Sequence, residues 1–86
     1  MKIDFHKSFY KQASNLKPAQ KKRLKQALLL FADEPYHADL YNHPLGGDWK
    51  GFRSISFFGD WRAHYSVIEE STILFVAVGT HSQLYK

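Results

Sequence analysis

The order of apolar and polar residues changes period early in the chain. Residues 2–6 alternate, with Ile3 and Phe5 on one side and polar residues on the other, which is typical of a short half-buried strand. After this segment, apolar residues recur three and four positions apart, at Phe9, Ala13 and Leu16. This spacing predicts an amphipathic helix that begins at Lys7, directly after the strand.

A second helix is predicted to begin at Pro18, whose missing N–H costs nothing in the first turn of a helix. Its apolar stripe consists of Leu24, Ala27, Leu28 and Phe31. We expect the helix to end near Asp33, because Pro35 restricts the backbone of the residue before it.

The second half of the chain changes to a period of two. A connector over residues 33–48, too polar to belong to a core, ends at Gly46-Gly47. Three strand-like segments follow it, at 50–57, 61–67 and 72–78. Short turns separate these segments, and the tail over residues 79–86 is predicted to be a loop or a single helical turn.

These elements give the order β-α-α-β-β-β within a single domain, residues 1–86. Two consecutive amphipathic helices followed by an antiparallel meander indicate an α+β fold. The two N-terminal helices are expected to pack on one face of a small, twisted antiparallel sheet. The other face is expected to be open and concave, with Arg53 among the residues that line it.

The composition narrows the class of protein. With 86 residues, 44% hydrophobic and 16% aromatic, the chain has enough apolar side chains for one compact core. It contains no cysteine, which excludes disulfides, thiol catalysis and zinc sites with cysteine ligands. No apolar run approaches the roughly 20 residues of a membrane span, and the first residues lack the apolar stretch of a signal peptide. A cytoplasmic protein with no membrane association is therefore expected.

Charge is distributed unevenly along the chain. The formal net charge is +4, and eight of the twelve Lys and Arg residues lie within the first 25 positions. Such a basic segment indicates an anionic partner, either a nucleic acid or an acidic protein, although a solvated helix face would have the same composition. For an RNA partner, the candidate contacts on the second helix are Lys21, Lys22 and Lys25.

Three motifs in the second half of the chain resemble one family. They are His-Pro-Leu-Gly-Gly-Asp-Trp-Lys-Gly-Phe-Arg at 43–53, Phe-Gly-Asp-Trp at 58–61 and Val-Gly-Thr-His-Ser-Gln-Leu-Tyr at 78–85. Together with the order of the elements, they are similar to the YafQ branch of the RelE/ParE toxins, the toxin halves of bacterial type II toxin–antitoxin modules. The resemblance implies ribosome-dependent cleavage of mRNA and a cognate antitoxin as partner. It also implies functional roles for His43, Asp60, His81 and Tyr85.

Two positions depart from the pattern of that branch. Ser56 stands where the branch usually carries a histidine, and Val78 where it carries an arginine. Residues 59–65 are instead similar to the strand of RelE proper whose active-site arginine matches Arg62. Because Arg62 and Val78 lie toward the same end of a predicted hairpin, we expect both side chains to approach the same phosphate, with Arg62 supplying the missing charge. The alternative is a surface ion pair between Arg62 and Asp60.

RNA cleavage by attack of the 2′-hydroxyl needs an acid, a base and cationic donors for the charge that grows around phosphorus. Histidine suits the first two roles because its ordinary pKa is about 6.5, and arginine suits the third because its planar fork binds two oxygens. His81 and His43 are the candidate proton-transfer groups, with a simple loop role as the alternative for each. His64, in the middle of a predicted strand, is interpreted as a sheet histidine with satisfied hydrogen bonds. No metal ion or cofactor is expected, because the histidines lack the spacing of a ligand set.

Further candidates to contact RNA are Trp49, Lys50 and Arg53. An exposed aromatic side chain beside the glycine-rich connector is suited to stacking on an unpaired nucleobase. Burial in the core is the alternative for the aromatic residue, and contact with the acidic connector is the alternative for Arg53.

Two other functions remain open from the sequence. ParE-like toxins share the fold and inhibit DNA gyrase by binding, without cleaving anything. A toxin weakened by Ser56 and Val78 would only engage its antitoxin. The residues suited to acid–base chemistry favour the ribonuclease, which we expect to be a monomer when free and part of a hetero-oligomer with its antitoxin.

Overall fold

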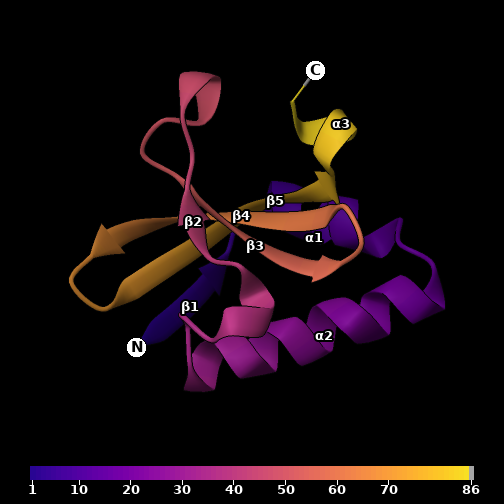
Figure 1. Ribbon diagram of the computed structural model, residues 1–86, viewed down its shortest axis with the longest axis horizontal. Coiled ribbons are helices and arrows are strands. Elements are labelled where there is room, and N and C mark those ends of the chain that lie inside the picture. The colour runs from indigo at the N-terminus through magenta and orange to yellow at the C-terminus, as the bar shows by residue number, and fades with distance from the viewer. Residues whose placement is uncertain (86) are drawn as a thin grey trace.

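A five-stranded sheet in the order β1-β5-β4-β3-β2 forms the centre of the fold (Figure 1). This computed structural model describes residues 1–85, and Lys86, the last residue of the predicted C-terminal turn, lies outside them. The elements are β1 (Lys2–Phe5), α1 (Lys7–Ser14), α2 (Pro18–Asp33), η1 (Ala38–Leu40), β2 (His43–Pro44), η2 (Gly47–Trp49), β3 (Arg53–Phe58), β4 (Trp61–Glu69), β5 (Thr72–Thr80) and α3 (His81–Leu84). The predicted α+β fold is confirmed, with the short strand β2 and the 3₁₀ turns η1 and η2 added to it, and the single helical turn that was one of the two options for the tail is α3. Within residues 1–85, no helix is long and apolar enough to cross a membrane.

The direction of the first strand differs from the prediction. β1 pairs with β5 in parallel, with Lys2 opposite Thr72 and Phe5 opposite Phe75, so the sheet is mixed and not purely antiparallel. Side-chain alternation shows which face a strand buries, but it contains no information about the strand's neighbour or direction. α1 follows β1 immediately and packs on β5, which places the first strand beside the last.

The hydrophobic core lies between α1, α2 and one face of the sheet. The buried residues of the predicted apolar stripes are Phe9 in α1 and Leu24, Ala27 and Phe31 in α2, and Leu16 is buried just after α1 ends. Phe31 meets Tyr65 and Phe75 edge-on, with ring centroids 5.0 and 5.3 Å apart. These aromatic contacts join α2 to β4 and β5 across the core.

The connector after α2 takes part in the core, contrary to the prediction that it is too polar to do so. Leu40 from η1 is 1% exposed and belongs to the central cluster of apolar side chains. η1 packs against β3. Asn42 adds to this contact, because it forms hydrogen bonds with Tyr65 and accepts one from Arg53 Nε. The average polarity of the connector therefore does not show that part of it is buried.

β3 and β4 present different residues to the two sides of the sheet. Ile55, Ala63 and Tyr65 are buried on the side of the helices. The alternating positions form the opposite face and are occupied by Ser54, Ser56, Arg62 and His64. η2 and α3 rise on this second side of the sheet, away from α2 (Figure 1). The second face is thus polar and partly covered, not fully open as predicted.

Arg53 does not line that second face, and the prediction that it does is wrong. It precedes Ser54 in β3 and therefore points to the same side as Ile55. Its Nε donates to Asn42 Oδ1 at 3.0 Å, and its guanidinium lies 5.4 Å from the centre of the Tyr36 ring. These contacts hold Arg53 against the connector.

Candidate active site

Polar side chains form two rows across the sheet face that lies opposite the helices. In the first row, His43 of β2 lies opposite Ser54 of β3, which in turn lies opposite His64 of β4. In the second row, Ser56 lies opposite Arg62. Paired residues of neighbouring strands share a face, so two imidazoles and one guanidinium gather on one surface. We call this surface the active face.

α3 places His81 and Tyr85 beside the active face. Thr80 caps the N-terminus of the helix, because its Oγ1 accepts a hydrogen bond from the Gln83 backbone N–H at 3.2 Å. The His81 backbone N–H donates to the Asp60 carbonyl oxygen at 2.9 Å, which ties the helix to the turn between β3 and β4. The rings of His81 and Tyr85 stack at 4.4 Å. The structure therefore brings together Asp60, His81 and Tyr85, three of the residues for which the sequence motifs imply a function.

Trp49 connects η2 to α3 above the sheet. Its indole Nε1 donates to the Leu84 carbonyl oxygen at 3.0 Å, and its ring lies edge-on to His64 with centroids 4.4 Å apart. Gly47 and Gly51 flank the turn with φ angles of 58° and 95°, a backbone region that favours glycine. The loop can thus fold over the active face. Trp49 is partly buried by these contacts, and its stacking on RNA stays a prediction, as does the role of the exposed Lys50 that follows it.

His43 has its tautomer set by a backbone contact. Its Nδ1 lies 2.8 Å from the Tyr41 carbonyl oxygen, and since a carbonyl only accepts, Nδ1 is the donor. In the neutral ring, Nε2 is then free to accept a proton. Tyr41 itself has a left-handed backbone, with φ of 49°, which turns its carbonyl toward the imidazole.

Arg62 is held by the turn between β3 and β4. Its Nη1 donates to the carbonyl oxygens of Gly59 and Trp61 at 2.8 and 3.1 Å. The ion pairs within residues 1–85 do not include one between Arg62 and Asp60, so the surface-pair alternative is not found there. Arg62 lies two residues before His64 on β4 and therefore on the same face, and its charge adds to the effect of burial in lowering the pKa of His64.

Val78 does not face the phosphate position expected for it. It lies opposite Ala63, is 3% exposed and packs in the core, whereas Arg62 lies opposite Gly79. Val78 and Arg62 therefore point to opposite sides of the sheet, and the prediction that they approach one phosphate is wrong. The hairpin of β4 and β5 brings Val78 close to Arg62 along the strands. The face to which each side chain points alternates from residue to residue, so a difference of one position in the pairing puts the two side chains on opposite faces.

His64 differs most from its interpretation in the sequence. Its side chain is 0% exposed, and neither ring nitrogen has a hydrogen-bond partner among residues 1–85, so it is not the satisfied histidine that was predicted. Burial lowers its pKa to about 4, with smaller contributions from His43, Arg62 and His81. Its position two residues after Arg62 on one strand was the signal that both lie on the same face.

The buried imidazole predicts a loss of stability on mild acidification. Below about pH 6.5 the unfolded chain protonates His64 while the folded chain, with a pKa of about 4, does not. The free energy of unfolding should therefore fall by on the order of 3 kcal/mol between these two pH values. Urea unfolding at a series of pH values measures it. In His64→Leu the contribution should be absent, and parallel curves for the two proteins would contradict the assignment.

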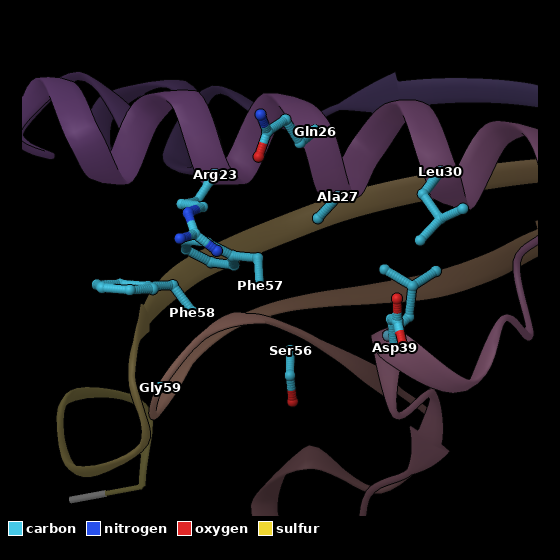
Figure 2. A pocket seen from close by; sticks show the side chains of 10 residues that line it. Arg23, Gln26, Ala27, Leu30, Asp39, Ser56, Phe57, Phe58 and Gly59 are labelled. Atoms are coloured by element: carbon cyan, nitrogen blue, oxygen red, sulfur yellow. The ribbon is translucent and has the colours of Figure 1, made fainter.

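Two grooves border the helices. One, of about 570 Å³, is bordered by apolar residues of α1, α2 and β1, with Lys21 and Lys25 at its rim. The other, of about 440 Å³, lies between α2 and β3, where the Arg23 guanidinium sits 5.2 Å from the centre of the Phe58 ring. Ser56 borders this second groove, and Figure 2 shows its side chain pointing away from α2.

The basic residues of α2 are not part of the active face. Lys21, Lys22 and Lys25 are exposed on a helix that packs on the other side of the sheet (Figure 1). Their contact with RNA stays a prediction. Within residues 1–85, no three His, Asp or Glu side chains gather closely enough to hold a metal ion.

Comparisons with known proteins agree with this arrangement. The chain matches, over residues 1–86, the family model described as a bacterial toxin of type II toxin–antitoxin system, YafQ. The mRNA interferase toxin YafQ of Escherichia coli (strain K12) is 31% identical over 80 residues, which cover 85% of this chain and 86% of that protein.

Solved structures show the same similarity. YafQ from E. coli strain BL21(DE3) superposes with a TM-score of 0.77 at 27% identity, covering 98% of this chain and 97% of the other. The toxin in the E. coli DinJ–YafQ toxin–antitoxin complex superposes with a TM-score of 0.75 at 28% identity, covering 98% of this chain and 96% of the other. A YoeB/ParE toxin from Agrobacterium tumefaciens shares the fold. It superposes with a TM-score of 0.76 at 16% identity, covering 94% of this chain and 99% of the other.

Proposed function

Because this chain belongs to the YafQ family of bacterial toxins from type II toxin–antitoxin systems, we propose that it is an mRNA interferase, an endoribonuclease that cleaves messenger RNA. The observation that carries the proposal is the active face, where His43 and Arg62 lie near His64, and where Tyr85 joins His64 to His81. We propose further that it acts in the cytoplasm, on mRNA held by the ribosome.

The active face contains the groups that cleavage by 2′-hydroxyl attack requires. The ribose 2′-oxygen attacks phosphorus, the bond between phosphorus and the 5′-oxygen breaks, and the products carry a 2′,3′-cyclic phosphate and a 5′-hydroxyl. We assign the base to His43, whose free Nε2 accepts the 2′-hydroxyl proton. His81 is then the acid that protonates the departing 5′-oxygen, and Arg62 stabilises the charge on the phosphoryl oxygens.

Tyr85 and Asp60 act by positioning His81. Tyr85 stacks on the His81 ring at 4.4 Å, and burial raises the pKa of its hydroxyl, which therefore stays protonated at neutral pH. Asp60 holds the first residue of α3 through its backbone carbonyl. The contribution of Asp60 is thus assigned to the backbone of the turn, and that of Tyr85 to its ring.

A reaction containing the purified protein, ribosomes and mRNA tests the proposed function. We expect mRNA fragments whose ends carry the cyclic phosphate and the 5′-hydroxyl. Intact mRNA together with inhibition of DNA gyrase would assign the chain to the ParE-like alternative. Intact mRNA, uninhibited gyrase and tight binding of an antitoxin would identify a weakened toxin.

We propose an antitoxin as the partner, by analogy with the E. coli complex. The groove between α1, α2 and β1 offers apolar residues with Lys21 and Lys25 at its rim, which fits an acidic amphipathic segment that folds on binding. The free toxin is proposed to be a monomer and the complex a hetero-oligomer.

Expression of the protein alone is expected to slow bacterial growth, and co-expression of the antitoxin encoded next to it should restore growth. Growth curves with separately inducible genes measure both effects. His81→Gln is the matched control, because it should be harmless and still bind the antitoxin. A wild-type protein that is harmless at high level and captures no product of a neighbouring gene would contradict the toxin assignment.

A further inference from the structure

His64 and its cross-strand partner leave buried polar atoms without hydrogen bonds. Neither Nδ1 nor Nε2 of His64 has a partner among residues 1–85, and the same is true of Oγ of Ser54, which lies opposite it and is 1% exposed. Buried polar groups in proteins are almost always hydrogen-bonded, because an unsatisfied one costs folding free energy. Two such groups side by side on the active face indicate a partner from outside the chain.

The imidazole of His64 is covered by two short segments. The Trp49 ring lies edge-on at 4.4 Å and the Tyr85 ring edge-on at 5.5 Å. The hydrogen bond from Trp49 Nε1 to the Leu84 carbonyl oxygen joins these segments, and we call it the latch. η2 has three residues and α3 has four, neither contains a buried residue, and Tyr85 is 38% exposed. Opening the latch therefore uncovers His64 at little cost to the core.

The surroundings of His64 favour an anionic partner. Burial, and to a smaller extent the charges of His43, Arg62 and His81, lower the pKa of His64 to about 4, so the imidazole is neutral at pH 7. A neutral imidazole has one N–H donor and one acceptor nitrogen. A phosphate oxygen can accept from that donor, and Arg62 can balance its charge. The RNA backbone supplies such oxygens.

We propose that His64 is an RNA-contacting residue of the active face: when the latch opens, its imidazole donates a hydrogen bond to a phosphate oxygen of the bound mRNA. The proposal rests on the proposed function for the identity of the ligand. The closed latch is then a resting arrangement, in which His64 lacks partners and lowers the stability of the free protein.

Substitution of His64 by leucine separates this role from a packing role. Leucine is close to the imidazole in size and has no polar atoms to leave unsatisfied. In His64→Leu we expect Tm to rise by about 5 °C, while kcat/KM for cleavage of ribosome-bound mRNA falls roughly 10- to 100-fold. His64→Gln, which retains an N–H donor, should recover part of the activity. A histidine that only packs the sheet would give a lower or unchanged Tm and full cleavage.

A second apolar variant and a matched control accompany this measurement. His64→Phe keeps an aromatic ring between Trp49 and Tyr85 but removes both polar ring atoms. It should lose cleavage to the same extent as His64→Leu, and it takes the place of that variant if leucine prevents folding. His37→Leu makes the same chemical change in the connector, outside the active face, so it should leave cleavage within about threefold of wild type. Equal losses in His37→Leu and His64→Leu would show that the effect does not come from the active face and would overturn the contact.

Binding measured without cleavage distinguishes failure of this inference from failure of the proposed function. The probe is a ribosome programmed with mRNA that is 2′-O-methylated in the A-site codon, because this RNA cannot undergo 2′-hydroxyl attack. We expect His64→Leu to bind it roughly 10-fold more weakly than wild type. A wild-type protein that binds but never cleaves unmodified mRNA would overturn the proposed function alone. Equal affinities of wild type and His64→Leu, or no binding by wild type, would overturn the RNA contact.

Discussion

Replacing His81 by glutamine is expected to slow mRNA cleavage by roughly 10²- to 10⁴-fold, the usual contribution of a general acid or base. Glutamine can form hydrogen bonds but cannot donate a proton to the departing 5′-oxygen at neutral pH. The fold should be retained, because the His81 side chain is exposed and the contact with Asp60 uses the backbone N–H. The loss should therefore appear in the cleavage rate and not in Tm.

Single-turnover cleavage of ribosome-bound mRNA measures this effect. His37→Gln is the control, since His37 lies in the connector before η1, where its Nδ1 accepts a hydrogen bond from the Asp39 backbone N–H. It should cleave at nearly the wild-type rate. Similar losses in both variants, or none in either, would show that His81 has no special role in proton transfer.

Arg62→Lys is expected to reduce cleavage by roughly 10²- to 10³-fold, the cost of removing one preorganised donor to a developing charge. Nη1 of Arg62 is bound to the carbonyls of Gly59 and Trp61, which fixes the planar guanidinium at the edge of the active face. Lysine has a single ammonium on a flexible stem and cannot hold the turn and reach a phosphoryl oxygen in the same geometry.

Arg23→Lys provides the matched control for this substitution. Arg23 lies over the Phe58 ring in the groove between α2 and β3 (Figure 2), outside the active face, so the same chemical change should leave cleavage unaffected. Val78→Arg should not rescue Arg62→Ala. It would place a charge in the core, where Val78 is 3% exposed, and should lower Tm. Rescue by Val78→Arg, or full activity of Arg62→Lys, would contradict the role of Arg62.

The two long helices and the three strands of the meander could be predicted from the sequence, because the buried side of each is marked by a regular repeat of apolar residues. The stripe that contains Leu24 and Phe31 marks the buried side of α2, and both residues are in the core. The alternation of Ser54 with Ile55 separates the two faces of β3 correctly. The motif residues His43, His81 and Tyr85 also lie on the same side of the sheet. The family motifs implied that these residues act together, whereas the alternation of apolar and polar residues gave no information about it.

Features that depend on pairing between distant segments could not be predicted in this way. β1 joins β5 in parallel because α1 packs on β5, a contact between segments about 60 positions apart. Leu40 is buried although its neighbours in the connector are polar. Arg53 turns to Asn42 and Tyr36, because its position in β3 points it to the side of the helices.

By itself, the sequence determined which residues are apolar, how they repeat along each helix and strand, and which histidines and arginines are available for chemistry. Only the tertiary structure decided which of these groups meet. Val78 and Arg62 lie on adjacent strands but on opposite faces, whereas His64 lies beneath Trp49 and Tyr85 with both nitrogens unpaired among residues 1–85. The physical reason is that periodicity is a property of one segment, while register, burial and the resulting pKa depend on the segments packed against it.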